Sequence, residues 1–158
     1  DEEIGLGIVG MKPQDPSLVA EPFLEDRLQL VAAPDHPLCS GEPVPLKDVL
    51  GEKLILREDG SGTRAELLSA LKKSGVARDR LNIEIELGST RASITAVENG
   101  LGLSWISEIA VRDSLTLNKV SPVRLADFAV VRRFYIVHHR SRTLSPLGQS
   151  FKAYLLEE

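Results

Sequence analysis

Two short segments rich in glycine and hydroxyl residues have the composition of anion-binding sites. Residues 60–64 read GSGTR and residues 88–90 read GST, and each segment comes directly before the apolar spacing of a helix. A helix start exposes N–H groups and the positive end of the helix dipole, which attract oxyanions. The structural alternative is a capping box formed by Thr63 and Glu66. For one helix start taken alone, the cap is the simpler interpretation.

Other motifs that could carry chemistry have structural interpretations. Residues 5–10, GLGIVG, match the spacing of a dinucleotide-binding fingerprint, but that fingerprint must open a helix, which Pro13 and Pro16 prevent. Neighbouring His138 and His139 would point to opposite faces of a strand and could not bind one metal ion together. The sequence contains no nucleophile elbow. We therefore expect no catalytic residue, no metal site and no cofactor.

The remaining polar candidates are expected to be solvated. His36 stands in a turn between prolines. Four arginines surround the last predicted strand, where a solvated edge is the first interpretation and a phosphate-contacting patch the second: Arg132, Arg133, Arg140 and Arg142.

Composition limits the function further. The 158 residues carry a formal net charge of −4, which gives the chain as a whole no electrostatic attraction to nucleic acid. Cys39 is the only cysteine, so an internal disulfide is excluded. No apolar run reaches the roughly 20 residues of a membrane helix, and no basic segment followed by an apolar one opens the sequence. These features are compatible with a cytoplasmic protein that has no membrane partner.

Hydrophobic periodicity predicts an α/β fold with much parallel sheet, because short apolar runs alternate with helical patterns. The predicted strands are residues 4–9, 18–24, 27–33, 53–57, 82–87, 101–106, 117–123 and 130–139, and the predicted helices are 45–50, 63–74, 90–99, 107–113 and a last helix with Ser145 as its cap. In a parallel sheet, helices that follow strands begin at one edge. Both hydroxyl-rich helix starts should therefore face the same crevice, which permits a ligand site without requiring one.

Five segments in a fixed order carry a resemblance to a known family. They are DEEIGLGIVG, EPFLEDRLQLVAAPDHPL, PLKDVLGEKLILREDGSGTR, ELGSTRASITAVENGLGLSWIS and RRFYIVHHRSRTLSPLGQSFKAYL. Together they resemble the effector-binding domain of LysR-type transcriptional regulators across nearly the whole chain. GSGTR, ELGST and LSPLGQSF are most similar to the subgroup that responds to cysteine metabolism and sulfite.

The resemblance implies two Rossmann-like lobes of the type 2 periplasmic-binding-protein architecture, with a small anionic effector such as a sulfur oxyanion or carboxylate bound between them. Residues 1–24 and 131–158 would form the first lobe, and residues 25–130 the second. Carried over by position, the expected effector-binding residues are Gly10 and Met11 on the first lobe and Ser61, Gly62, Thr63, Arg64, Ser89 and Thr90 on the second.

The sequence also departs from the family pattern. The family's domain begins with further strands and helices, and its winged helix-turn-helix lies upstream of them. We therefore expect a piece of a longer regulator with an incomplete first lobe, which self-associates and reaches DNA only through a domain outside this sequence. The alternatives are a periplasmic-type solute-binding protein and, less favoured, an enzyme of the same two-lobed fold.

Overall fold

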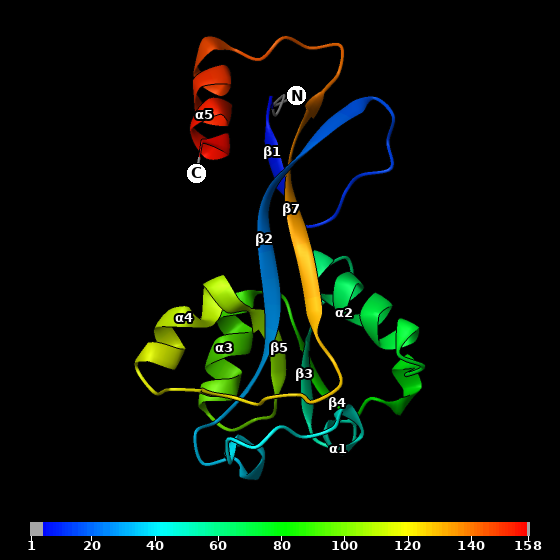
Figure 1. The fold of residues 1–158 in the computed structure, drawn as a ribbon, viewed down its shortest axis with the longest axis vertical. Helices are drawn as coiled ribbons and strands as arrows, with labels where there is room; N and C mark the ends of the chain where they lie inside the picture. Colours follow the sequence, from blue (N-terminus) through cyan, green and yellow to red (C-terminus); the bar gives the residue numbers. More distant parts are fainter. Residues whose placement is uncertain (1–4, 158) are drawn as a thin grey trace. The chain divides into compact units, whose positions relative to one another are not determined.

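A computed structural model describes residues 5–157 of the chain (Figure 1). The chain divides into two compact units: one runs up to Asp26 and resumes at Arg132, and the other comprises Arg27–Val131. The division falls inside two long strands, β2 (Leu18–Ala32) and β7 (Val130–His139). Each strand therefore contributes residues to both units.

The second unit is a mixed sheet covered by helices. Its strands are β3 (Leu54–Arg57), β4 (Ile83–Leu87), β5 (Ser104–Ser107), the short β6 (Ser121–Pro122) and the end of β2. Strands β3 and β4 pair in parallel, and an isolated parallel bridge joins Leu54 to Leu103, the residue before β5. Strand β2 pairs antiparallel with β5 and β6. The sheet therefore contains fewer parallel strand pairs than predicted, because β2 runs antiparallel to its neighbours β5 and β6.

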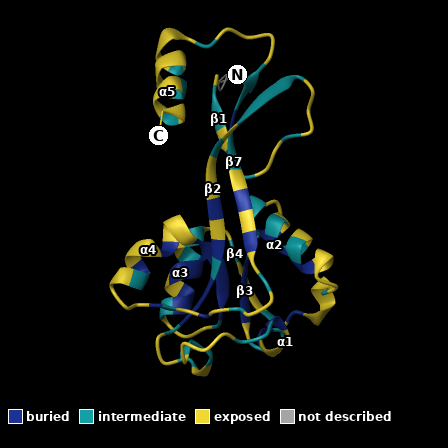
Figure 2. Cartoon of the chain, in the orientation of Figure 1, coloured by how far each residue is buried: buried dark blue, intermediate teal, exposed yellow. Residues whose placement is uncertain are grey.

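Helices cover both faces of this sheet. They are α1 (Leu46–Val49), α2 (Gly62–Lys73), α3 (Thr90–Glu98) and α4 (Glu108–Thr116), with short 3₁₀ turns η1 (Pro37–Cys39) and η2 (Arg78–Arg80). Leu54 and Leu56 of β3 pack in one cluster with residues of α1 and α2, whereas Ile55 packs in a second cluster with residues of α3 and α4. Figure 2 shows these buried residues gathered along the strands and the inner helix surfaces. Burial on both faces explains the continuous apolar run of β3.

The first unit contains β1 (Gly7–Val9), the first part of β2, most of β7 and α5 (Pro146–Leu156). Strand β1 pairs antiparallel with β7, and Gly7 lies opposite Val137. The Ser145 hydroxyl accepts a hydrogen bond from the Gly148 N–H, which confirms the predicted cap of the last helix. Helix α5 has no buried residue. Its apolar side chains therefore contribute little to a core.

Several predicted boundaries were wrong. The strands expected at 18–24 and 27–33 are one strand, because the Asp26 carboxylate is held by Arg132 and does not interrupt the pairing. The strand expected at 117–123 shrinks to Ser121–Pro122, and the helix expected at 107–113 extends to Thr116. Of the strand predicted at 4–9, Ile4 lies outside the described residues, and pairing is described for Gly7–Val9.

Candidate functional site

Three helices of the second unit begin where parallel strands end. Helix α2 follows β3, α3 follows β4 and α4 follows β5, so the geometry of a parallel sheet brings their N-termini to one edge. The N-cap residues are Ser61, Ser89 and Ser107. The helix after β5 was predicted as well, but only the first two starts were expected to take part in a ligand site, although SWIS followed by a helical pattern carries the same signal.

The predicted capping box at Thr63 is wrong. Helix α2 begins at Gly62 with Ser61 as its N-cap, so Thr63 already lies inside the first turn. The Ser61 side chain makes no cap hydrogen bond, whereas the Ser89 hydroxyl accepts one from the Ala92 N–H at 3.1 Å. Because Gly60 adopts a φ of +85°, the chain turns sharply before the helix. The backbone conformation of this turn therefore explains the glycine at position 60.

Arg57 was not among the predicted site residues, yet it lies at this edge. It is the last residue of β3 and lines a small cavity with Thr63, Thr90, Ser93 and Ser107, together with Trp105 and Ile106. Its Nη1 donates a hydrogen bond to the Thr90 hydroxyl oxygen at 2.7 Å. The cavity therefore brings one guanidinium together with hydroxyl residues from all three helix starts.

Glu58 neutralises that guanidinium. Arg57 Nε lies 2.7 Å from Glu58 Oε2, and Nη2 lies 2.8 Å from Oε1. This two-point ion pair holds the pKa of the Glu58 carboxyl below its ordinary value. Glu58 is therefore ionised at neutral pH and remains bound to Arg57.

Arg64 supports the site from within the fold. Its side chain is 8% exposed, and Nη1 donates to the Arg57 carbonyl oxygen at 3.1 Å and to Glu86 Oε2 at 2.8 Å. Hydrogen bonding to Arg64, with a further contribution from Arg78, holds the pKa of Glu86 below its ordinary value. These contacts direct the Arg64 guanidinium toward β3 and β4. Its expected role in effector binding stays a prediction.

Gly10 and Met11 belong to the first unit. A side chain at Gly10 would meet the Phe134 ring at 3.5 Å and Arg132 Nη1 at 3.6 Å, and Met11 is 47% exposed. No helix follows β1; the next element is strand β2. The GLGIVG segment therefore lacks the helix that a dinucleotide-binding site needs. The assignment of Gly10 and Met11 to effector binding stays a prediction.

The histidines and arginines outside the cavity make local contacts. His36 accepts a hydrogen bond from the Leu38 N–H and caps η1, and His139 Nδ1 lies 2.9 Å from the Ser141 hydroxyl. The expectation of a solvated Arg132 was wrong, since its side chain is 6% exposed and pairs with buried Asp26 at 2.8 Å. Within residues 5–157, no group of three or more His, Cys, Asp or Glu residues could hold a metal ion.

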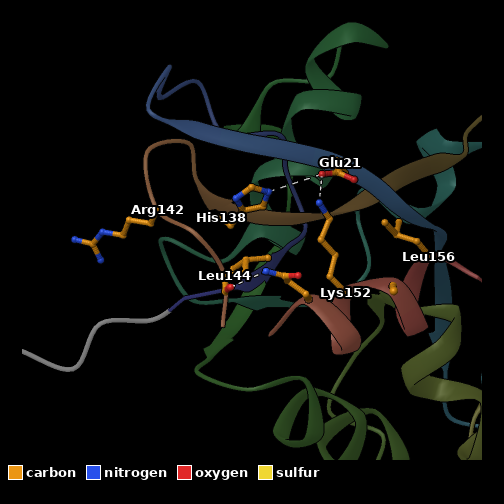
Figure 3. Close-up of a pocket in the computed structure, with 8 residues that line it drawn as sticks. Glu21, His138, Arg142, Leu144, Lys152 and Leu156 are labelled. Atoms are coloured by element: carbon orange, nitrogen blue, oxygen red, sulfur yellow. Dashed lines mark hydrogen bonds and ion pairs between the residues drawn. The ribbon is translucent and has the colours of Figure 1, made fainter. Parts of the chain in front are cut away.

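A larger cavity of about 450 Å³ lies in the first unit, between α5 and the strands (Figure 3). Glu21 is one of the residues that line it, hydrogen-bonded to Lys152 and 3.8 Å from His138 Nε2. The charges of Glu21 and Lys152 satisfy each other, and Arg142 points away from them. This cluster fastens α5 to β2 and β7, which is a structural role.

The fold and the edge of helix starts define a periplasmic-binding-protein-like α/β ligand-binding domain. The model of the LysR substrate binding domain matches residues 1–158, and the chain belongs to this family. The HTH-type transcriptional regulator YeiE of Escherichia coli strain K12 is 34% identical over 154 residues, which cover 98% of this chain and 51% of that protein. A RuBisCO operon transcriptional regulator of Acidithiobacillus ferrooxidans is 35% identical over 153 residues, which cover 95% of this chain and 48% of that protein. The chain thus spans about half the length of these relatives.

Solved structures agree with this assignment. The Synechocystis PCC6803 CcmR regulatory domain in complex with 2-PG superposes with a TM-score of 0.87 at 30% identity, covering 98% of this chain and 73% of that one. The effector binding domain of QuiR in complex with shikimate gives a TM-score of 0.83 at 22% identity, covering 97% and 70%, and supports the fold alone. The matches favour a regulator domain over the solute-binding alternative. Across the described part of the chain, no helix has the length and apolarity to cross a membrane.

Proposed function

We propose that the chain senses a small oxyanion metabolite at the edge of the second unit where α2, α3 and α4 begin. The observation that carries the proposal is the convergence of Arg57, Thr63, Thr90 and Ser107 at this edge, around a cavity of about 10 Å³ that is itself too small to enclose an oxyanion. A guanidinium and hydroxyl groups next to helix N-termini recognise carboxylates, phosphates and sulfur oxyanions by the same hydrogen bonds.

The expected ligand-binding groups are the backbone N–H groups at Gly62 and Thr63 and the hydroxyls of Ser61, Thr63, Ser89 and Thr90. The Thr90 oxygen accepts from Arg57 Nη1, so the Thr90 hydroxyl hydrogen can donate to an anion at the same time. The effector would change the conformation of the regulator only if it bound one arrangement of the protein more tightly than another. The chain itself would catalyse no reaction, in agreement with the regulator names of its relatives.

A solved relative and the resemblance support this choice of effector class. The CcmR domain was solved with 2-PG. The similarity of GSGTR and ELGST to the sulfite-responsive subgroup adds sulfite and sulfate as candidates. We propose a cytoplasmic regulator that contacts DNA through a helix-turn-helix outside this sequence, as the names of its relatives suggest.

Replacing Thr90 with Val tests the site. Each hydrogen bond to a charged group contributes about 1.5–3 kcal/mol, so Thr90→Val should weaken binding about 10- to 150-fold. Calorimetric titration of the chain with 2-PG, sulfite and sulfate measures this change. Thr90→Ser is the matched control, because it retains the hydroxyl and should bind within a few-fold of the unchanged protein.

Thr63→Val provides a second probe of the same surface. Because Ser61 is the N-cap, this substitution removes no N-cap residue and should weaken anion binding more than it lowers stability. Thermal unfolding without ligand measures the stability change. Unchanged affinity in both threonine variants would contradict the proposed site and leave the helix starts with a structural role alone.

A further inference from the structure

Arg57, which lines the cavity at the candidate site, is paired with Glu58. Arg57 presents two nitrogens, Nε and Nη2, along one edge of its guanidinium, and both lie within 2.8 Å of Glu58 carboxylate oxygens. The third nitrogen, Nη1, donates a hydrogen bond to the Thr90 hydroxyl oxygen. An effector carboxylate or phosphate would bind this edge with the same two-point geometry.

We propose that Glu58 is a built-in competitor: its carboxylate holds the Nε/Nη2 edge of Arg57, and an oxyanion effector binds by taking this edge and releasing Glu58 to solvent. This inference rests on the proposed function and adds the device that sets effector affinity. Glu58 therefore determines how much effector is needed to occupy the site.

Exposure and connectivity favour such an exchange. The Glu58 side chain is 41% exposed, whereas that of Arg57 is 19% exposed. Arg57 is also fixed at its backbone, because Arg64 donates to its carbonyl oxygen. The carboxylate can thus swing into water while the guanidinium keeps its place beside Thr90.

Competition also explains how the site discriminates among ligands. A ligand with a single negative oxygen replaces only one of the two Glu58 contacts, whereas a carboxylate, phosphate or sulfate replaces both. The net gain on binding is the difference between the new contacts and those of Glu58. Ligands that present two oxygens to Arg57 are therefore selected.

The direct test is calorimetric titration of the unchanged chain and Glu58→Gln with 2-PG and with sulfate. Glutamine cannot form the charged two-point pair, so the variant should bind about 1.5- to fivefold more tightly. Glu84→Gln is the matched control: Glu84 is 45% exposed, pairs with Lys53 at 3.1 Å and undergoes the same change of charge. The control should bind like the unchanged chain.

A second comparison separates competition for Arg57 from a simple effect of charge. In an Arg57→Lys background the two-nitrogen edge is gone, so Glu58→Gln should raise affinity less than it does in the unchanged chain. A gain of the same size in both backgrounds would overturn the proposal, since it would then come from the lost negative charge alone. Thermal unfolding of each variant verifies that it is folded.

The outcomes also separate this inference from the proposed function. Binding by the unchanged chain with equal or weaker binding by Glu58→Gln overturns the competitor and leaves the proposed site standing. Binding by Glu58→Gln alone supports the competitor and shows that the unchanged chain is held closed to these anions. Failure of both proteins to bind either anion overturns both proposals.

Discussion

At the scale of single residues, the two most informative arginines are held by carboxylates in opposite environments. Arg57 meets an exposed glutamate at the candidate site, whereas Arg132 meets Asp26, whose side chain is fully buried. Arg132 also stacks over the Phe134 ring, with its guanidinium carbon 4.6 Å from the ring centre. An exposed pair can exchange partners with a ligand, while a buried pair cannot open without leaving a charge unsolvated.

Replacing Arg132 with Met should therefore destabilise the protein strongly. It leaves the Asp26 carboxylate buried without this cation, and removing one partner of a buried pair costs about 3–5 kcal/mol. Arg133→Met is the matched control, because Arg133 pairs with Glu25 at 3.3 Å on the surface and should cost about 1 kcal/mol or less. Urea denaturation of both variants measures the difference, and equal costs would contradict the assigned role of the buried pair.

At the scale of elements, the candidate site depends on how closely β5 approaches β3. Leu103 N donates to the Lys53 carbonyl oxygen, and Ile55 N donates to the Leu103 carbonyl oxygen, both at 2.8 Å. Gly102 makes this approach possible: its φ is +154°, and a Cβ there would lie 2.5 Å from the Lys53 carbonyl oxygen. The position of the α4 start relative to the α2 start therefore depends on one glycine.

Gly102→Ala should separate β5 from β3. The added carbon meets backbone that cannot move without breaking the bridge, and the strained conformation adds about 1–3 kcal/mol. Thermal unfolding should show a clear loss of stability. Gly51→Ala is the control, because a Cβ at Gly51 meets nothing within 4 Å; a loss at Gly51 as large as that at Gly102 would refute the steric explanation.

At the scale of the whole molecule, the apolar surface of the first unit bears on assembly. Ile8 is 46% exposed, and α5 exposes Leu147 at 80%, Phe151 at 47% and Tyr154 at 62%. Exposed apolar groups on an element without buried residues favour association with another surface.

We predict that the 158-residue chain self-associates through α5. Sedimentation velocity should show a weight-average mass that rises with concentration, and Leu147→Glu combined with Tyr154→Glu should reduce it, because charges on the contact surface resist burial. Leu117→Glu, at a residue of the second unit that is 64% exposed, is the control and should leave association unchanged. A monodisperse monomer at every concentration would refute the prediction.

The sequence by itself determined the elements whose signals are local. Residues 130–139 form the predicted strand, and Ser145 caps the last helix as predicted, because apolar alternation and a cap followed by Pro146 act within a few residues. The family also followed from short motifs in order along the chain. The two hydroxyl-rich helix starts could be recognised for the same reason.

Only the tertiary structure decided which partners these residues meet. Arg57 is hydrogen-bonded to Thr90, which lies 33 residues away in the sequence, and Arg132 is hydrogen-bonded to Asp26, which lies 106 residues away. Hydropathy and spacing place a charged residue on an element, but the ion pair forms because separate strands converge in space. For that reason Arg132 was predicted to be solvated and Thr63 was predicted to cap the helix. The sequence did not indicate that Arg57 pairs with Glu58 and Thr90.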